Sequence, residues 1–153
     1  MPDPSFLVET VPFFIDPKVA FVHTPQTYAN LHTTVARGAG YMQTVFYRFI
    51  QPGRNRFNAA FCVGTNVLFS RAAIDDVGGM YTDSKSEDVW TSIRLHERGW
   101  RSVFIPDVLA VGDAPESVEA YSKQQLRWAM PPSRSRRTPS SNCGGRREAS
   151  KSC

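Results

Sequence analysis

An acidic pair, Glu87 and Asp88, is the first feature of this 153-residue sequence that could carry chemistry. Ser86 precedes the pair and is suited to be the N-cap of a helix. The predicted apolar face of that helix is formed by Val89, Ile93, His96 and Trp100. Acidic residues in a first helical turn are often purely structural, because they offset the helix dipole. The alternative is that one of the two carboxylates acts as a general base.

A second cluster, formed by Gln124, Arg127 and Trp128, lies at the end of another predicted helix. It offers a fixed cation, an amide that can form hydrogen bonds, and an aromatic ring. Taken alone, Trp128 is more typical of ordinary helix packing than of a ligand platform. The presence of both clusters shifts the balance toward a functional site with a base on one side and a cation on the other.

Both clusters match motifs of one enzyme family. Residues 86–88 resemble the Thr-Glu-Asp motif, and residues 124–128 match the Gln-x-x-Arg-Trp motif, of processive family 2 glycosyltransferases such as the cellulose synthases. The resemblance covers residues 2–129, and its several ordered motifs make it far more specific than either cluster alone. Supporting motifs follow the order of the family: Thr24-Pro25-Gln26, Cys62-Val63-Gly64-Thr65-Asn66, Gly78-Gly79, Leu95-His96-x-x-Gly99-Trp100 and Gly112-x-Ala114-Pro115.

The resemblance implies a role for each residue of the two clusters. Asp88 would be the base that takes the proton from the acceptor hydroxyl, and Glu87 would orient Asp88 or bind backbone amides. Arg127 would bind the leaving diphosphate with its planar guanidinium, because that geometry suits a charged diphosphate better than a flexible ammonium. Gln124 would hydrogen-bond the diphosphate or the sugar, and Trp128 would stack against an acceptor sugar.

The same resemblance places residues 61–65 beside the acceptor. In this sequence Cys62 and Val63 stand where relatives carry Phe and Cys, so the acceptor contacts of that family cysteine do not transfer. Gly64 and Thr65 follow the family pattern and are the predicted substrate-binding residues of this stretch.

Relatives also hold a divalent ion, Mg²⁺ or Mn²⁺, through an Asp-x-Asp motif that typically reads Asp-Ala-Asp-x-x-Pro. Pro2 would be that proline, so we expect the metal-binding aspartates just upstream of Met1 and assign no metal ligand in this chain. Asp3 and Asp16 each stand beside a proline in a predicted loop and do not form the motif. The isolated chain is therefore expected to be inactive.

The pattern of the whole chain predicts an α/β fold. Strands are expected at 19–22, 67–69, 103–105 and 108–111, and helices at 6–14, 30–50, 70–77, 86–99 and 116–128. The helix at 30–50 could be hinged near residues 38–40, and residues 51–56 are predicted to form a turn. By resemblance, the chain is the C-terminal half of a GT-A, Rossmann-like glycosyltransferase domain.

Composition divides the chain into residues 1–130, the predicted glycosyltransferase portion, and residues 131–153. The second part is rich in Ser, Arg, Gly and Pro and carries the excess positive charge behind the net +4, so we expect it to be disordered. Its cations lack interleaved aromatic residues, which argues against nucleic-acid binding. The three cysteines have no metal-ligand spacing and predict neither a zinc site nor a disulfide framework.

No run approaches the ~18 apolar residues of a membrane-spanning helix, and the first residues lack the pattern of a signal peptide. Full-length relatives are integral membrane proteins, so the resemblance implies a catalytic domain at the cytoplasmic face of a membrane. The predicted function is that of a fragment of an inverting, processive β-glycosyltransferase that transfers glucose from UDP-glucose to a growing polysaccharide. The alternative is an inactive fragment or pseudoenzyme that acts only by docking to other proteins.

Overall fold

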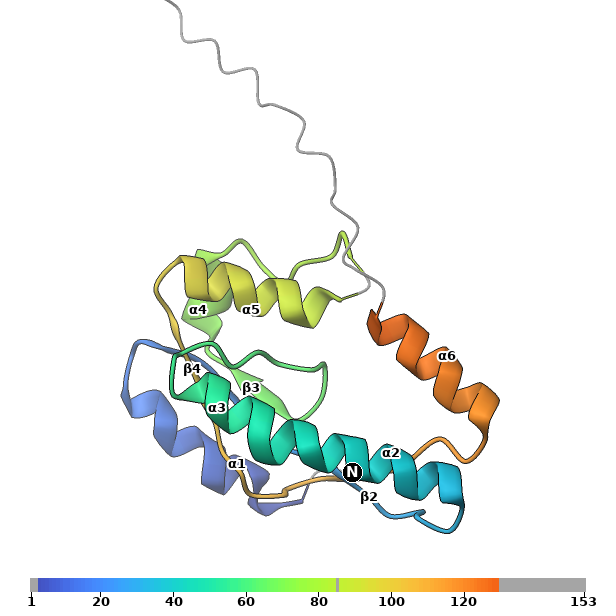
Figure 1. Cartoon of the computed structure of the whole chain (residues 1–153). Coiled ribbons are helices and arrows are strands. Elements are labelled where there is room, and N and C mark those ends of the chain that lie inside the picture. Colours follow the sequence, from blue (N-terminus) through green and yellow to red (C-terminus); the bar gives the residue numbers. More distant parts are fainter. Residues whose placement is uncertain (1–2, 85, 130–153) are drawn as a thin grey trace, which may run out of the picture.

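The computed structural model describes residues 3–84 and 86–129 (Figure 1). Its helices are α1 (Ser5–Thr10), α2 (Thr34–Val45), α3 (Gln51–Asn55), α4 (Arg71–Asp76), α5 (Glu87–Glu97) and α6 (Val118–Ala129), with a 3-10 turn η1 (Val11–Ile15) and a π turn η2 (Phe46–Ile50). Its strands are β1 (Val19–His23), β2 (Thr27–Tyr28), β3 (Val67–Phe69), β4 (Arg101–Phe104) and β5 (Val111–Gly112). The predicted disorder of residues 131–153 lies outside the described residues.

The described part of the chain is built on a three-stranded sheet in the order β3-β1-β4. β1 runs parallel to β4 and antiparallel to β3, and a separate parallel ladder joins β2 to β5. This mixture of helices and strands confirms the predicted α/β class. The strand predicted at 108–111 is displaced, because only its last residue belongs to β5.

β1 lies at the centre of the sheet, and all five of its residues are buried. Phe21 packs against Leu95 of α5 in the main core cluster, to which α4 also contributes. Val22 belongs to a second cluster that includes Phe14 of η1. Helices α4 and α5 therefore lie on one side of the sheet and the α1–η1 segment on the other (Figure 1). This burial fixes the start of α5 relative to the sheet.

Residues 34–55 form one continuous helical stretch through α2, η2 and α3. The predicted turn at 51–56 is therefore wrong, and no break occurs at residues 38–40. The π turn directly precedes Pro52, where the missing N–H could not complete a regular helical hydrogen bond. Gln51 is fully buried, and its Nε2 donates a hydrogen bond to the Phe61 carbonyl at 2.8 Å. This tertiary bond favours the helix where local sequence favours a turn.

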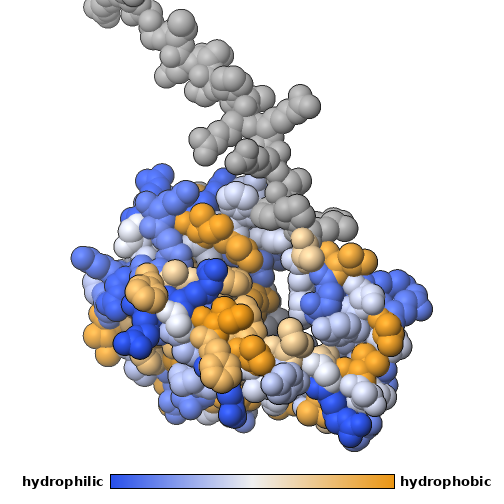
Figure 2. Space-filling model, in the orientation of Figure 1, coloured by the Kyte–Doolittle hydropathy of each residue, from blue (hydrophilic) through white to orange (hydrophobic). Residues whose placement is uncertain are grey.

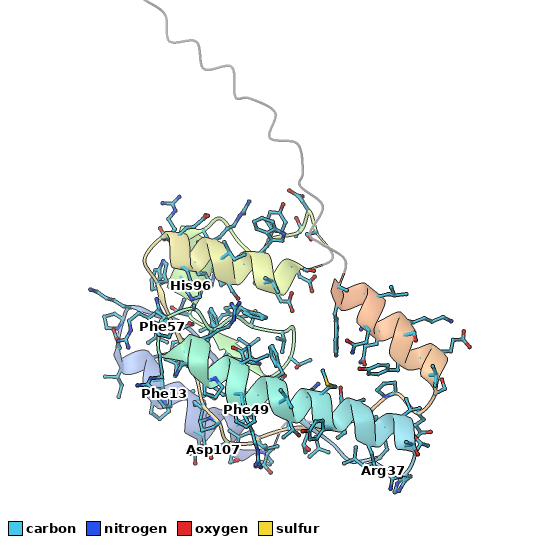
Figure 3. All side chains as sticks on the ribbon, viewed as in Figure 1. Phe13, Arg37, Phe49, Phe57, His96 and Asp107 are labelled. Carbon is cyan, nitrogen blue, oxygen red and sulfur yellow. The ribbon has the colours of Figure 1, made fainter. Side chains whose placement is uncertain are left out.

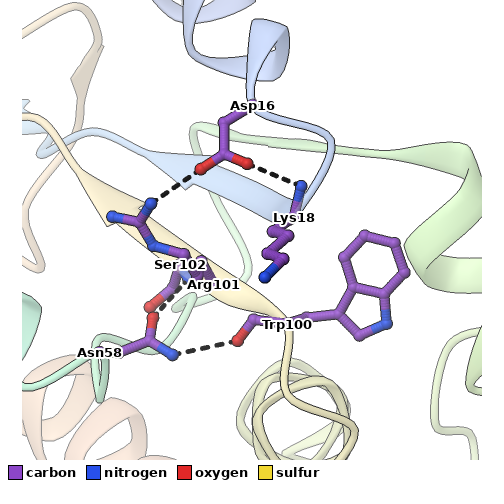
Figure 4. A network of polar contacts seen from close by, with 6 residues as sticks. All are labelled: Asp16, Lys18, Asn58, Trp100, Arg101 and Ser102. Atoms are coloured by element: carbon purple, nitrogen blue, oxygen red, sulfur yellow. Dashed lines mark hydrogen bonds and ion pairs between the residues drawn. The ribbon is translucent and has the colours of Figure 1, made fainter.

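The outer edge of β4 is covered by two asparagine side chains. Asn58 Oδ1 accepts a hydrogen bond from the Ser102 N–H at 2.9 Å, and its Nδ2 donates to the Trp100 carbonyl at 3.1 Å (Figure 4). Asn55 Oδ1 accepts from the Phe104 N–H at 2.9 Å. These amides take the place of a neighbouring strand, so backbone groups at that edge are satisfied.

We predict that Asn58→Gly destabilises the fold by about 1–3 kcal/mol, because it removes both side-chain hydrogen bonds to the backbone around β4. Asn58 has a φ of 51°, a left-handed conformation that glycine adopts without strain. Asn58→Ala should cost about 1 kcal/mol more, since it loses the same bonds and keeps a Cβ. Urea unfolding of the three proteins measures both differences. A glycine variant as stable as the wild type would contradict the prediction.

Candidate functional site

Asp88 lies in the first turn of α5, where its side chain is half-buried. The Val89 N–H donates a hydrogen bond to Asp88 Oδ1 at 2.7 Å. Burial raises the pKa of Asp88 above its usual value; the Val89 hydrogen bond opposes the rise, and the adjacent Glu87 carboxylate adds to it. A raised pKa increases the proton affinity of the carboxylate, which is the property that a general base requires.

The loop that was predicted to face the acceptor lies against this carboxylate. Gly64 has a φ of +75°, and a Cβ added there would meet Asp88 Oδ2 at 3.3 Å. A side chain at this position would therefore be strained by the backbone and crowded by the carboxylate. The structure brings the predicted residues Gly64 and Asp88 together, from segments more than twenty positions apart in sequence.

Hydrogen bonds hold this loop against the first turn of α5. Ser92 Oγ accepts from the Cys62 N–H at 3.0 Å and donates to the Asp88 carbonyl at 2.9 Å. The Cys62 thiol also donates to the Asp88 carbonyl, at 3.2 Å. Burial raises the pKa of Cys62 to about 11, so the thiol stays protonated and can act as a donor. Cys62 supports the site through its backbone and thiol while remaining buried.

The buried face of α5 differs from the predicted one. Thr91, Ser92 and Leu95 are fully buried, whereas Ile93 of the predicted apolar face is exposed. Polar residues can occupy the buried face because the Thr91 and Ser92 hydroxyls donate to the carbonyls one turn earlier, at 2.6 and 2.9 Å. Ser86 occupies the N-cap position, but its side chain makes no capping hydrogen bond.

Thr65 and Glu87 are both exposed beside this contact. The Thr65 side chain is hydrogen-bonded to the hydroxyl of Tyr47, a buried residue of η2. Burial raises the pKa of Tyr47 to about 12, so this hydroxyl remains protonated. Thr65 is thereby anchored to the long helical stretch, while Glu87 stays available to solvent.

The second predicted cluster lies on α6. Gln124 and Arg127 line an open hollow of about 540 Å³ between α6 and the loop that follows β5. The surface is visibly hollowed beside this helix (Figure 2). Trp128 is 56% exposed, so ordinary helix packing does not account for it. The remaining lining residues are Asp113, Ala114, Pro115, Ala120 and Lys123.

Lys123 and Asp113 are the lining residues that could bind a charged ligand and that the sequence-based prediction missed. Lys123 stands four residues before Arg127, a helical spacing that places both cations on one face. Lys123 Nζ forms an ion pair with Glu119 at 2.7 Å, but both side chains are highly exposed. An exposed pair of this kind contributes little to stability, so the ammonium is free to exchange partners.

The two predicted clusters do not touch. Within residues 3–84 and 86–129, no hydrogen bond or ion pair joins α5 to α6. In the view of Figure 1, the first turn of α5 points toward the last turn of α6. The structure thus presents a carboxylate site around Asp88 and Gly64, and a separate cationic hollow around Gln124 and Arg127.

The described residues do not fit a divalent metal. Across the placed part of the chain, no group of three or more His, Cys, Asp and Glu side chains is arranged to hold an ion. Asp16 Oδ2 is paired with Arg101 at 2.7 Å (Figure 4), and Asp3 Oδ1 accepts hydrogen bonds from Ser5. Any role of Mg²⁺ or Mn²⁺ therefore contributes no step to the chemistry of these residues.

The chain matches the family described as "Glycosyl transferase family group 2" over residues 1–138, and it belongs to that family. It is 36% identical over 132 residues to a UDP-forming cellulose synthase of Dictyostelium discoideum, in its catalytic polypeptide, covering 84% of this chain and 12% of the relative. It is 30% identical over 139 residues to the corresponding UDP-forming cellulose synthase polypeptide of Xanthomonas axonopodis pv. citri, covering 84% of this chain and 18% of the relative.

This protein is thus a family 2 glycosyltransferase of the cellulose synthase-like type, as its motifs predicted. The chain spans less than a fifth of the length of the relatives just described. Among the described residues, no helix is both long and apolar enough to cross a membrane.

We predict that Asp88→Asn raises the urea midpoint at pH 7 and that this gain shrinks as the pH falls toward 3.8, the ordinary pKa of Asp. The pKa of Asp88 is raised in the folded state, so its protonated form stabilises the fold at low pH. That contribution is lost as the pH rises through the folded pKa, whereas Asn mimics the protonated form at every pH.

Asp107→Asn is the matched control, because Asp107 is exposed and lies outside α5 (Figure 3). Urea titrations between pH 3.5 and 7.5, roughly the range in which carboxylates titrate, would measure both variants. A stability gain for Asp88→Asn that does not change with pH would contradict the assigned burial of this carboxylate.

Proposed function

We propose that this chain supplies the acceptor-activating and diphosphate-binding parts of an inverting, processive β-glycosyltransferase that transfers glucose from UDP-glucose to a growing polysaccharide. In this proposal, residues 1–130 are the C-terminal part of a GT-A domain in a longer, membrane-associated polypeptide that works at the cytoplasmic face. The observation that carries it is the half-buried carboxylate of Asp88 held against Gly64. The names of the relatives, which are UDP-forming cellulose synthases, support the choice of donor and product.

Asp88 is the proposed base. Inverting transfer requires a base that removes the proton from the acceptor hydroxyl while the leaving group departs from the opposite face of the sugar. The carboxylate has a raised pKa, and no ion pair to a cation neutralises it among the described residues. Gly64 leaves open the space beside Oδ2, where an acceptor hydroxyl can approach. Exposed Thr65 would bind the same sugar, and Glu87 would orient the base.

Arg127 and Gln124 are the proposed diphosphate ligands. The leaving diphosphate gains negative charge during the reaction, and a planar guanidinium can offer it two parallel hydrogen bonds. Both residues line the same hollow, and Lys123 adds a second cation there. Trp128 is exposed beside them and would stack against the apolar face of an acceptor sugar. The Mg²⁺ or Mn²⁺ of this proposal would be held by an Asp-x-Asp motif elsewhere in the longer polypeptide.

A chimera tests the role of the base. In it, the matched segment of this chain replaces the corresponding segment of the Xanthomonas relative, and polymer synthesis from UDP-glucose is measured. We predict that Asp88→Asn lowers the rate on the order of 10²-fold or more, the usual scale for losing a general base, with UDP binding nearly unchanged. Asp107→Asn serves as the control. Near-wild-type synthesis by the Asp88→Asn chimera would exclude Asp88 as the base.

UDP binding to the 153-residue chain tests the diphosphate site. We predict that Arg127→Lys weakens UDP binding about fivefold, because the charge remains but the two-pronged hydrogen bonding is lost. Arg98→Lys, at an exposed residue beyond the end of α5, is the matched control. Calorimetric titration would measure all three proteins. Equal affinities for wild type and Arg127→Lys would make Arg127 an ordinary surface cation.

A second candidate function is docking to other proteins without catalysis. It is favoured by large apolar side chains that are exposed on the described part of the chain, among them Phe49 at 72% and Phe57 at 83% (Figure 3). Exposed aromatic residues are typical of interaction surfaces. The same titration separates the candidates, because a purely docking protein has no affinity for UDP.

A further inference from the structure

One asparagine holds the loop wall of the hollow. Asn30 Oδ1 accepts a hydrogen bond from the Ala114 N–H at 2.6 Å, and Asn30 Nδ2 donates to the Ala114 carbonyl at 2.9 Å. The same Nδ2 donates to Glu116 Oε1 at 2.9 Å. Ala114 is buried and lines the hollow. A single side chain therefore satisfies both backbone groups of a residue 84 positions away and fixes the wall in place.

The segment around Asn30 follows the same wall along its length. β2 pairs with β5, and the Ala29 N–H donates to the Gly112 carbonyl at 3.0 Å. Beyond Asn30, the Thr33 hydroxyl donates to the Glu116 carbonyl at 3.3 Å and also accepts from the Ala36 N–H, which caps α2. Residues 27–33 thus tie the loop after β5 to the beginning of α2.

Tyr28, two residues before Asn30, reaches the opposite wall. It is 8% exposed and packs with Ala36, Ala39 and Ala114, with Tyr121 of α6 against the same cluster. Its hydroxyl is hydrogen-bonded to Gln124. Burial raises the pKa of Tyr28, so the hydroxyl keeps its proton and stays competent to bond the amide. Gln124 is one of the groups proposed above to bind diphosphate.

We propose that Asn30 and Tyr28 are positioning residues that set the separation between the loop wall and the α6 wall of the hollow. Neither residue lines the hollow itself, so both act through others: Asn30 through Ala114, and Tyr28 through Gln124. α6 has no buried residue in its described length, so the packing of its side chains alone does not fix its place. The identity of the ligand rests on the proposed function, whereas the positioning itself does not.

Hydrogen exchange tests the positioning without any ligand. In the 153-residue chain, Asn30→Ala should make the Ala114 amide exchange about tenfold faster, because its hydrogen-bond acceptor is removed. Tyr28→Phe should leave Ala114 unchanged and shift the Gln124 side-chain amide resonances. Tyr121→Phe removes a hydroxyl from the same cluster and should change neither signal. An unchanged Ala114 exchange rate in Asn30→Ala, or an unchanged Gln124 signal in Tyr28→Phe, overturns the inference.

UDP titration then tests the consequence for binding. Asn30→Ala and Tyr28→Phe should each weaken UDP binding about three- to tenfold, roughly the effect of one hydrogen bond. The effect of Tyr28→Phe should disappear in a Gln124→Ala background, because Tyr28 acts through that residue. A loss of thermal stability with unchanged affinity would make both residues merely structural and overturn the inference. A wild type that binds no UDP while exchange responds as expected refutes the proposed ligand and upholds the positioning.

Discussion

The contact between the Asp88 carboxylate and Gly64 constrains the rest of the described site. A half-buried carboxylate must be held where nearby groups neither crowd it nor neutralise it, and only glycine combines a φ of +75° with a position 3.3 Å from Oδ2. The loop that carries Gly64 is tied to the first turn of α5 through Ser92 and Cys62. α5 in turn packs on β1 in the main core cluster. The position of one carboxylate thus depends on an unbroken series of contacts that begins at the centre of the sheet.

The cationic side of the site is supported in a different way. α6 contributes no buried residue, and its neighbours are the residues of the small cluster around Tyr28. Its surroundings are organised by polar contacts from the segment 27–33, above all the two bonds of Asn30 to Ala114. A helix held in this way can change position at little cost in core packing, because the apolar core lies elsewhere. The base is therefore fixed by the core, whereas the predicted diphosphate ligands Gln124 and Arg127 depend on a polar scaffold at the periphery.

Sequence patterns predicted the elements whose signals are local. The apolar run before His23 became the buried strand β1, and the acidic start near Glu87 became α5. The errors arose where distant residues decide the outcome. Residues 51–56 carry turn-forming residues, yet Gln51 bonds to the Phe61 carbonyl and the helix continues. The buried face of α5 was misplaced because buried hydroxyls are satisfied by the helix's own carbonyls, which no count of apolar residues reveals. The motifs placed Gly64 near the base correctly, but Asn30 carries no motif and only its bonds identify it.

The separation of Asp88 from Arg127 follows from the chemistry proposed for them. In an inverting transfer, the attacking hydroxyl and the leaving diphosphate lie on opposite faces of the anomeric carbon, so the base and the diphosphate ligand must act from different sides of the sugar. An ion pair between the two residues would lower the proton affinity of the carboxylate and occupy the guanidinium that the diphosphate needs. Two clusters supported by different parts of the fold avoid both effects. Asp88 keeps its raised pKa because its neighbours are a glycine, a backbone N–H and a second carboxylate, and Arg127 faces an open hollow.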